Sequence, residues 1–245
     1  MTPRADPTWR LTVLGQWQLF CDGQRMHVTI RQQRVIAALA VLPARPRAMF
    51  SGLLWPEHPA VQAAGSLRAA LWRIRHDLPG LLDGGEDPPR LSPAVSSDIA
   101  QFRLRTEHCD ANDWACDPDF LVDLLDAELL PGWYDDWVCF EQDRLRQRKL
   151  TALRAYTEQR LRAGDAGPAL EAARMTASIE PFSETTQTLL IRALISLGDV
   201  PAAAEQLHRF RLLLMDELGV EPSPGMVALV RQSPREGTRV ATPAQ

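Results

Sequence analysis

The chain has 245 residues, of which 45% are hydrophobic and 24% charged, and its formal net charge at pH 7 is −4. This length accommodates two domains, each with a core of its own. No apolar run approaches the roughly 20 residues that cross a bilayer, and the N-terminus lacks the apolar segment of a secretion signal, so we expect a cytoplasmic protein with no membrane partner.

The cysteines and the absence of catalytic motifs exclude several classes of site. Four cysteines, Cys21, Cys109, Cys116 and Cys139, are irregularly spaced, which argues against a disulfide framework. His108, Cys109 and Cys116 lack the paired short spacing of zinc ligands, so we expect no metal ion. No nucleophile-elbow, phosphate-loop, metalloprotease or kinase motif is present, and we expect neither catalysis nor a cofactor.

The charge is divided unevenly along the chain. Residues 1–82 contain ten arginines and four acidic residues, whereas residues 83–245 contain seventeen basic and twenty-seven acidic residues. A basic N-terminal part followed by an acidic C-terminal part is typical of a protein in which only one domain contacts phosphate.

The N-terminal pattern predicts a small sheet. Residues 1–8 contain two prolines and no apolar pattern, so we expect a disordered arm. Apolar residues alternate along residues 9–20 and again along residues 26–30, on either side of a Cys-Asp-Gly-Gln turn. This alternation predicts a small antiparallel sheet.

Three helices and a ribbon are predicted next. Helical spacing of apolar residues indicates helices over residues 31–42, 50–55 and 60–78, the first ending at a proline. Residues 90–102 are expected to form a short two-stranded ribbon with Leu91 and Val95 facing inward. Sheet, three helices and ribbon together predict a winged helix-turn-helix domain over residues 9–102.

The rest of the chain is predicted to be mainly helical and internally repeated. Gly164-Asp165 recurs 34 residues later as Gly198-Asp199, and Ala169 recurs as Ala203. A 34-residue period with two helices per unit is typical of tetratricopeptide repeats. Helices at residues 119–130 and 140–163 are expected to stack on these units. We therefore predict a tetratricopeptide-like α-helical domain over residues 110–231 and disorder over residues 232–245.

The helix at residues 60–78 is the candidate recognition helix. Its apolar stripe of Leu67, Leu71, Ile74 and Leu78 is expected to be buried. Side chains that point away from this stripe or flank it are candidate DNA contacts, with Gln62 and Arg73 suited to read bases and Arg68 and Arg75 suited to phosphate. Trp72 could pack on the wing, rest against sugar-phosphate, or pack in the core or between domains, and the last role is favoured. The complete predicted DNA-binding set is Gln62, Ser66, Arg68, Ala69, Arg73, Arg75 and His76, with Arg31, Arg34, Arg45 and Arg47 as backbone contacts.

Several separate segments resemble one known family. Residues 31–42, 53–82 and 90–99 resemble the DNA-binding part of SARP-type transcriptional activators. Residues 128–165 and 179–230, including the string DELGVEPSP, resemble the bacterial transcriptional activation domain of that family. The resemblance implies a cytoplasmic, nucleoid-associated activator that binds direct repeats in double-stranded promoter DNA, recruits RNA polymerase and binds DNA as a homodimer.

The acidic aromatic string after residue 132 allows two interpretations. Trp133, Tyr134, Asp135, Asp136 and Trp137 are either a partner surface, for the polymerase or for a second protomer, or aromatic residues that pack at the end of the repeats. The alternative function for the whole chain is a helical-repeat interaction scaffold whose winged-helix domain does not bind DNA. The basic N-terminal part favours the DNA-binding regulator.

Overall fold

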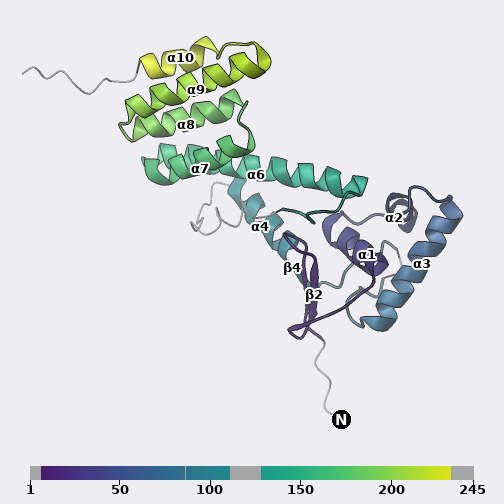
Figure 1. Cartoon of the computed structure of the whole chain (residues 1–245). Helices are drawn as coiled ribbons and strands as arrows, with labels where there is room; N and C mark the ends of the chain where they lie inside the picture. Colours follow the sequence, from purple (N-terminus) through teal and green to yellow (C-terminus); the bar gives the residue numbers. More distant parts are fainter. Residues whose placement is uncertain (1–6, 86, 111–127, 233–245) are drawn as a thin grey trace, which may run out of the picture. The chain divides into compact units, whose positions relative to one another are not determined.

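The computed structural model describes residues 7–85, 87–110 and 128–232 (Figure 1). Almost all of the arm and tail predicted to be disordered, Cys116 and most of the helix predicted at residues 119–130 lie outside these ranges. The chain divides into two compact units, one of residues 1–107 with 126–146 and the other of residues 108–125 with 147–245. A small N-terminal sheet followed by helical repeats confirms the predicted fold class.

A four-stranded sheet opens the N-terminal unit. Its strands are β1 (Trp9–Thr12), β2 (Gln18–Cys21), β3 (Gln24–Arg25) and β4 (Ser96–Ser97), in the order β3-β2-β1-β4. β1 pairs antiparallel with β2, Leu11 lying opposite Leu19, and parallel with β4. Trp9, Leu11, Val13 and Leu19 are all buried, as the alternation predicts.

Two details of the predicted sheet are wrong. The third strand is formed by Gln24–Arg25 and not by residues 26–30. Ile30 is instead the first residue of a helix. The ribbon over residues 90–102 does not form, since Ser96–Ser97 pairs with β1 and α4 (Asp98–Asp110) begins directly after it. A smaller hairpin-like contact is formed by a bridge between Leu82 and Leu91. Leu91 and Val95, which the sequence predicts to face inward, are only half-buried.

Three helices follow the first strands and pack on one another. They are α1 (Ile30–Val41), α2 (Arg47–Leu54) and α3 (Ala60–Asp77), and α3 contacts both others. Phe50 and Leu54 of α2 and Leu67, Leu71 and Ile74 of α3 are buried together with the sheet residues. This apolar burial supplies most of the stability of the helical cluster.

A segment distant in sequence completes the N-terminal unit. Leu129 forms an antiparallel bridge with Leu14, and the backbone N–H of Leu130 donates to the carbonyl of Val13 at 2.9 Å. Both Leu129 and Leu130 are buried. The compact unit therefore includes residues that the sequence assigns to the activation domain.

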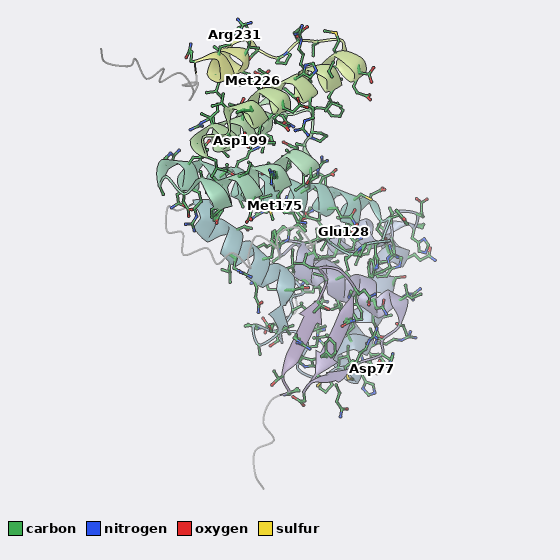
Figure 2. All side chains as sticks on the ribbon, turned by 60° about the vertical axis from the view of Figure 1, so that its left-hand side comes forward. Asp77, Glu128, Met175, Asp199, Met226 and Arg231 are labelled. Carbon is green, nitrogen blue, oxygen red and sulfur yellow. The ribbon has the colours of Figure 1, made fainter. Side chains whose placement is uncertain are left out.

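Five helices after this segment are described. They are α6 (Asp136–Arg162), α7 (Ala166–Ile179), α8 (Glu184–Ser196), α9 (Val200–Leu218) and α10 (Pro224–Arg231). Consecutive helices from α7 to α10 lie side by side (Figure 1). Their core contains Leu190, Ile191, Phe210 and, from α10, Met226, which Figure 2 labels.

The predicted repeat is confirmed at its corners. Gly164 and Gly198 both adopt a positive φ, of 77° and 79°, where glycine is strongly favoured. Asp165 and Asp199 are the N-caps of α7 and α9, and the Asp199 carboxylate accepts from the backbone N–H of Ala202 at 3.0 Å. The equivalent Ala169 and Ala203 are fully buried, so that small side chains occupy the close helix contacts.

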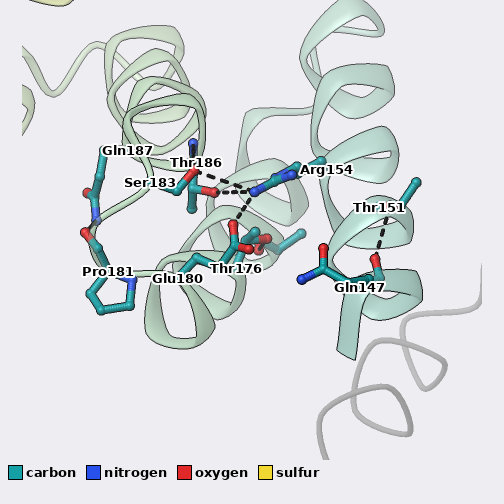
Figure 3. A network of polar contacts seen from close by, with 10 residues as sticks. Gln147, Thr151, Arg154, Thr176, Glu180, Pro181, Ser183, Thr186 and Gln187 are labelled. Carbon is teal, nitrogen blue, oxygen red and sulfur yellow. Dashed lines mark hydrogen bonds and ion pairs between the residues drawn. The ribbon is translucent and has the colours of Figure 1, made fainter. Parts of the chain in front are cut away.

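A polar network joins α6 to the corner between α7 and α8 (Figure 3). The Arg154 guanidinium pairs with the Glu180 carboxylate and donates to the hydroxyls of Ser183, at 3.4 Å, and Thr186, at 3.3 Å. The four side chains are at most partly exposed. This network fixes the position of the corner against α6 within the C-terminal unit. Among the helices that the structure describes, none combines the length and hydropathy needed to cross a bilayer.

Candidate nucleic-acid interface

A capping box and a buried glutamine fix the ends of two helices in the N-terminal unit. The Thr29 hydroxyl accepts from the backbone N–H of Gln32, and the Gln32 side chain accepts from the backbone N–H of Thr29 at 2.9 Å. The same buried amide donates to Asp77, which Figure 2 labels at the end of α3, at 3.0 Å. The start of α1 is therefore tied to the end of α3.

The outward face of α3 differs slightly from the predicted one. Ala63 and Ala70 are buried beside the predicted leucines. At about 100° per residue, these two alanines rotate the centre of the buried stripe. The centre of the exposed face therefore falls near Gly65, Trp72 and His76, rather than nearer to Arg73 as the sequence predicts.

The predicted DNA-binding residues of α3 lie around this centre. All are exposed except Ser66, which is half-buried. Arg68 and Arg75 flank one side and Arg73 the other, so that cations border the outward face on both sides. The Arg75 guanidinium also donates to the carbonyl of Gly85 at 3.1 Å, which ties α3 to the loop that follows it. The exposed members of the set are Gln62, Arg68, Ala69, Arg73, Arg75 and His76.

Trp72 lies near the centre of this face. Its side chain is 64% exposed, so the favoured packing in the core is wrong, while contact with DNA or with another domain stays a prediction. Its ring stacks on that of His76, with the centroids 5.3 Å apart and the planes 5° from parallel. Val61, 88% exposed, lies on the same side of the helix. The sequence does not indicate this rotation, because alanines such as Ala63 and Ala70 are compatible with either side of a helix.

The four predicted backbone contacts outside α3 fall into different environments. Arg31 is exposed, while Arg45 and Arg47 are half-buried. The Arg34 guanidinium pairs with the Asp135 carboxylate and donates to the carbonyl of Leu54 at 3.0 Å. Arg34 is thus used within the unit, and we remove it from the DNA-facing set.

Only part of the predicted partner surface is exposed to solvent. Tyr134 is 86% exposed and Asp136 is exposed, but Trp133 is half-buried and Asp135 pairs with Arg34. Trp137 is 5% exposed and belongs to the core. The five residues therefore do not form one exposed surface, and a partner role for Tyr134 and Asp136 stays a prediction. His108, Cys109 and Cys116, for which the sequence predicts no metal ion, have no described side chains.

Comparisons with known proteins identify the family. Residues 122–232 match the bacterial transcriptional activator domain. Regulatory protein AfsR of Streptomyces coelicolor is 28% identical over 237 residues, which cover 90% of this chain and 24% of that protein. AfsR of Streptomyces griseus is 26% identical over 99% of this chain and 26% of its own length. The chain resembles SARP-type activators, as the sequence predicts.

A solved structure supports the fold of this chain. The structure of Mycobacterium tuberculosis EmbR in complex with a low affinity phosphopeptide superimposes with a TM-score of 0.71, at 23% identity, over 93% of this chain and 66% of that one. The chain spans about a quarter of the length of the AfsR proteins that it matches. The predicted resemblance to SARP-type activators is confirmed, and the match to the activator domain falls on the helical repeats.

Proposed function

We propose that this chain is a sequence-specific DNA-binding transcription activator that reads DNA through the outward face of α3. It binds direct repeats in promoter DNA as a homodimer, and its helical repeats help to recruit RNA polymerase. The observation that carries the proposal is the exposed face of α3, where arginines border a centre of small and planar side chains.

The residue types on this face suit the major groove. Gly65 and Ala69 have no bulk, which allows the helix backbone to come close to base edges. Gln62 and Arg73 carry the bidentate groups that read adenine and guanine. Arg68, on the flank, is placed for a phosphate contact, which positions the helix without reading sequence.

The first experiment measures binding to the protein's own upstream region at several salt concentrations. Several phosphate contacts give a steep fall of affinity with salt, since each releases condensed counterions. A shallow slope, or no binding at low salt to any promoter fragment, would contradict the proposal and favour the interaction scaffold.

The second experiment tests base reading by Arg73. Arg73→Ala is expected to cost about 1–3 kcal/mol of binding free energy and to relax specificity at one base pair. Arg174→Ala is the matched control, because Arg174 is an exposed arginine in α7 of the other unit. Equal loss on every sequence would make Arg73 a phosphate contact instead.

The third experiment tests the close approach of α3. A Cβ added at Gly65 meets no atom within 4 Å, so Gly65→Leu is expected to leave the fold intact while its side chain holds the helix away from DNA. Gly167→Leu, which also meets no atom, is the control in α7. If Gly65→Leu binds DNA as tightly as the unaltered protein, α3 does not enter the groove.

A further inference from the structure

A pocket of about 580 Å³ lies within the N-terminal unit, away from the face of α3 proposed to bind DNA. Three segments line it. They are the end of α1, the end of α2 together with the residues that follow, and the start of α6 together with the residues that precede it. Its apolar lining consists of Leu42, Leu53, Pro56, Trp137 and Phe140. This volume accommodates a side chain with its neighbouring backbone and falls in the range of ordinary ligand sites.

Carboxylates predominate among the charged residues of the pocket. The lining contains Glu57, Asp135, Asp136 and Glu141 against the guanidinium of Arg45. Asp135 and Glu141 already form ion pairs with arginines. Glu57 and Asp136 are exposed and, within the ranges that the structure describes, form no ion pair. The free charge at the rim is therefore mainly negative, which disfavours phosphate and favours a cation.

Trp137 lines the pocket although only 5% of its surface is exposed. The indole Nε1 of Trp137 is buried and has no acceptor in the described part of the chain. A buried donor left without an acceptor lowers stability by about 1–3 kcal/mol. Because this atom has almost no accessible surface, the indole reports on packing beside the pocket and is not a contact for a ligand.

Two exposed aromatic side chains stand at the same pocket. Tyr134 is 86% and Phe140 63% exposed, although both line it. Large aromatic residues are enriched at protein interfaces, where they contribute a large share of the binding energy.

We propose that this pocket binds a peptide segment of a partner protein, in which an apolar side chain lies beside lysine or arginine. The apolar side chain fills the space between Leu42, Leu53 and Phe140. The basic side chain meets Glu57 and Asp136. The cation and the apolar group are both found in a basic, apolar peptide.

The test uses the full chain and three short fluorescent peptides in a glycine-serine background. Their central residues are Lys-Leu-Arg, Lys-Ser-Arg and Glu-Leu-Glu. We expect the first to bind, with an affinity that falls as salt is added, and the other two to bind at least about ten-fold more weakly. In NMR spectra, the indole N–H signal of Trp137, assigned with Trp137→Phe, is expected to shift on addition of the first peptide.

A matched pair of double variants separates the pocket from general acidity. Glu57→Gln with Asp136→Asn is expected to weaken the first peptide about ten-fold. Asp216→Asn with Glu217→Gln, two exposed acids of α9, is expected to leave it unchanged. Absence of binding by the first peptide, equal binding of the acidic peptide, or equal loss in both double variants would overturn the proposal. Peptide affinity is measured in the absence of DNA, so the outcome does not depend on the proposed function.

Discussion

At the scale of single residues, Asp98 holds the sheet to the start of α4. Its carboxylate accepts from the backbone N–H groups of Val13, Leu14 and Ile99, at distances from 2.7 to 3.0 Å. Asp98→Asn replaces one acceptor oxygen by a donor, so at least one of these N–H groups loses its partner. We expect the free energy of unfolding to fall by about 1–3 kcal/mol, measured by urea denaturation. Asp143→Asn, an exposed acid on α6, is the control.

Gly198 provides a second residue-scale prediction. Because its φ is 79°, Gly198→Ala is expected to destabilise the protein by about 1–2 kcal/mol. Gly167 lies inside α7 with open space around it, so Gly167→Ala is expected to be neutral or stabilising. Equal effects of the two substitutions in thermal unfolding would show that Gly198 does not need its left-handed conformation.

The sequence predicts the structural role of Gly198 but not that of Asp98. The Gly-Asp pair at residues 198 and 199 predicts a helix corner because its role is local and repeats after 34 residues. Asp98 could not be predicted, because its partners Val13 and Leu14 lie 85 and 84 residues away and nothing near Asp98 indicates them. The same holds for Arg34, whose partner Asp135 is 101 residues away.

At the scale of elements, residues 128–130 contribute both backbone hydrogen bonds and apolar side chains to the N-terminal unit. The backbone N–H of Gly15 donates to the carbonyl of Glu128 at 2.7 Å, next to the bridge between Leu14 and Leu129. Leu129→Ala in the full chain is expected to cost about 2–5 kcal/mol of unfolding free energy, because Leu129 is buried. Met49→Ala, an exposed position in α2, is expected to cost far less.

Periodicity predicts the helices well and the short strands poorly. Helices α1, α2 and α3 lie within a few residues of their predicted ranges, because a buried stripe repeats over several turns. The two-residue strand β4 has no such signal, and its pairing with β1 depends on a contact distant in sequence. The rotation of the α3 face could not be predicted either, because alanines are compatible with either side of a helix.

At the scale of the whole molecule, each unit has its own core, and we expect two transitions in calorimetry. Ala203→Leu overfills a fully buried position, so it is expected to lower one transition at a cost of about 1–3 kcal/mol and to leave the other unchanged. Ala204→Leu, at the next, exposed position, is the control. A single transition that shifts as a whole would show that the two units unfold together.

The bridge between Leu14 and Leu129 also limits how such proteins can be recombined. The activation-domain match begins at residue 122, yet residues 126–146 belong to the N-terminal unit. A chimera joined at residue 122 would take Leu14 and Arg34 from one parent. The counterparts of their partners, Leu129 and Asp135, would come from the other parent. Exchange of regulatory domains between relatives therefore has to carry residues 126–146 with the N-terminal domain, so that sequence pairs far apart in the chain are inherited together.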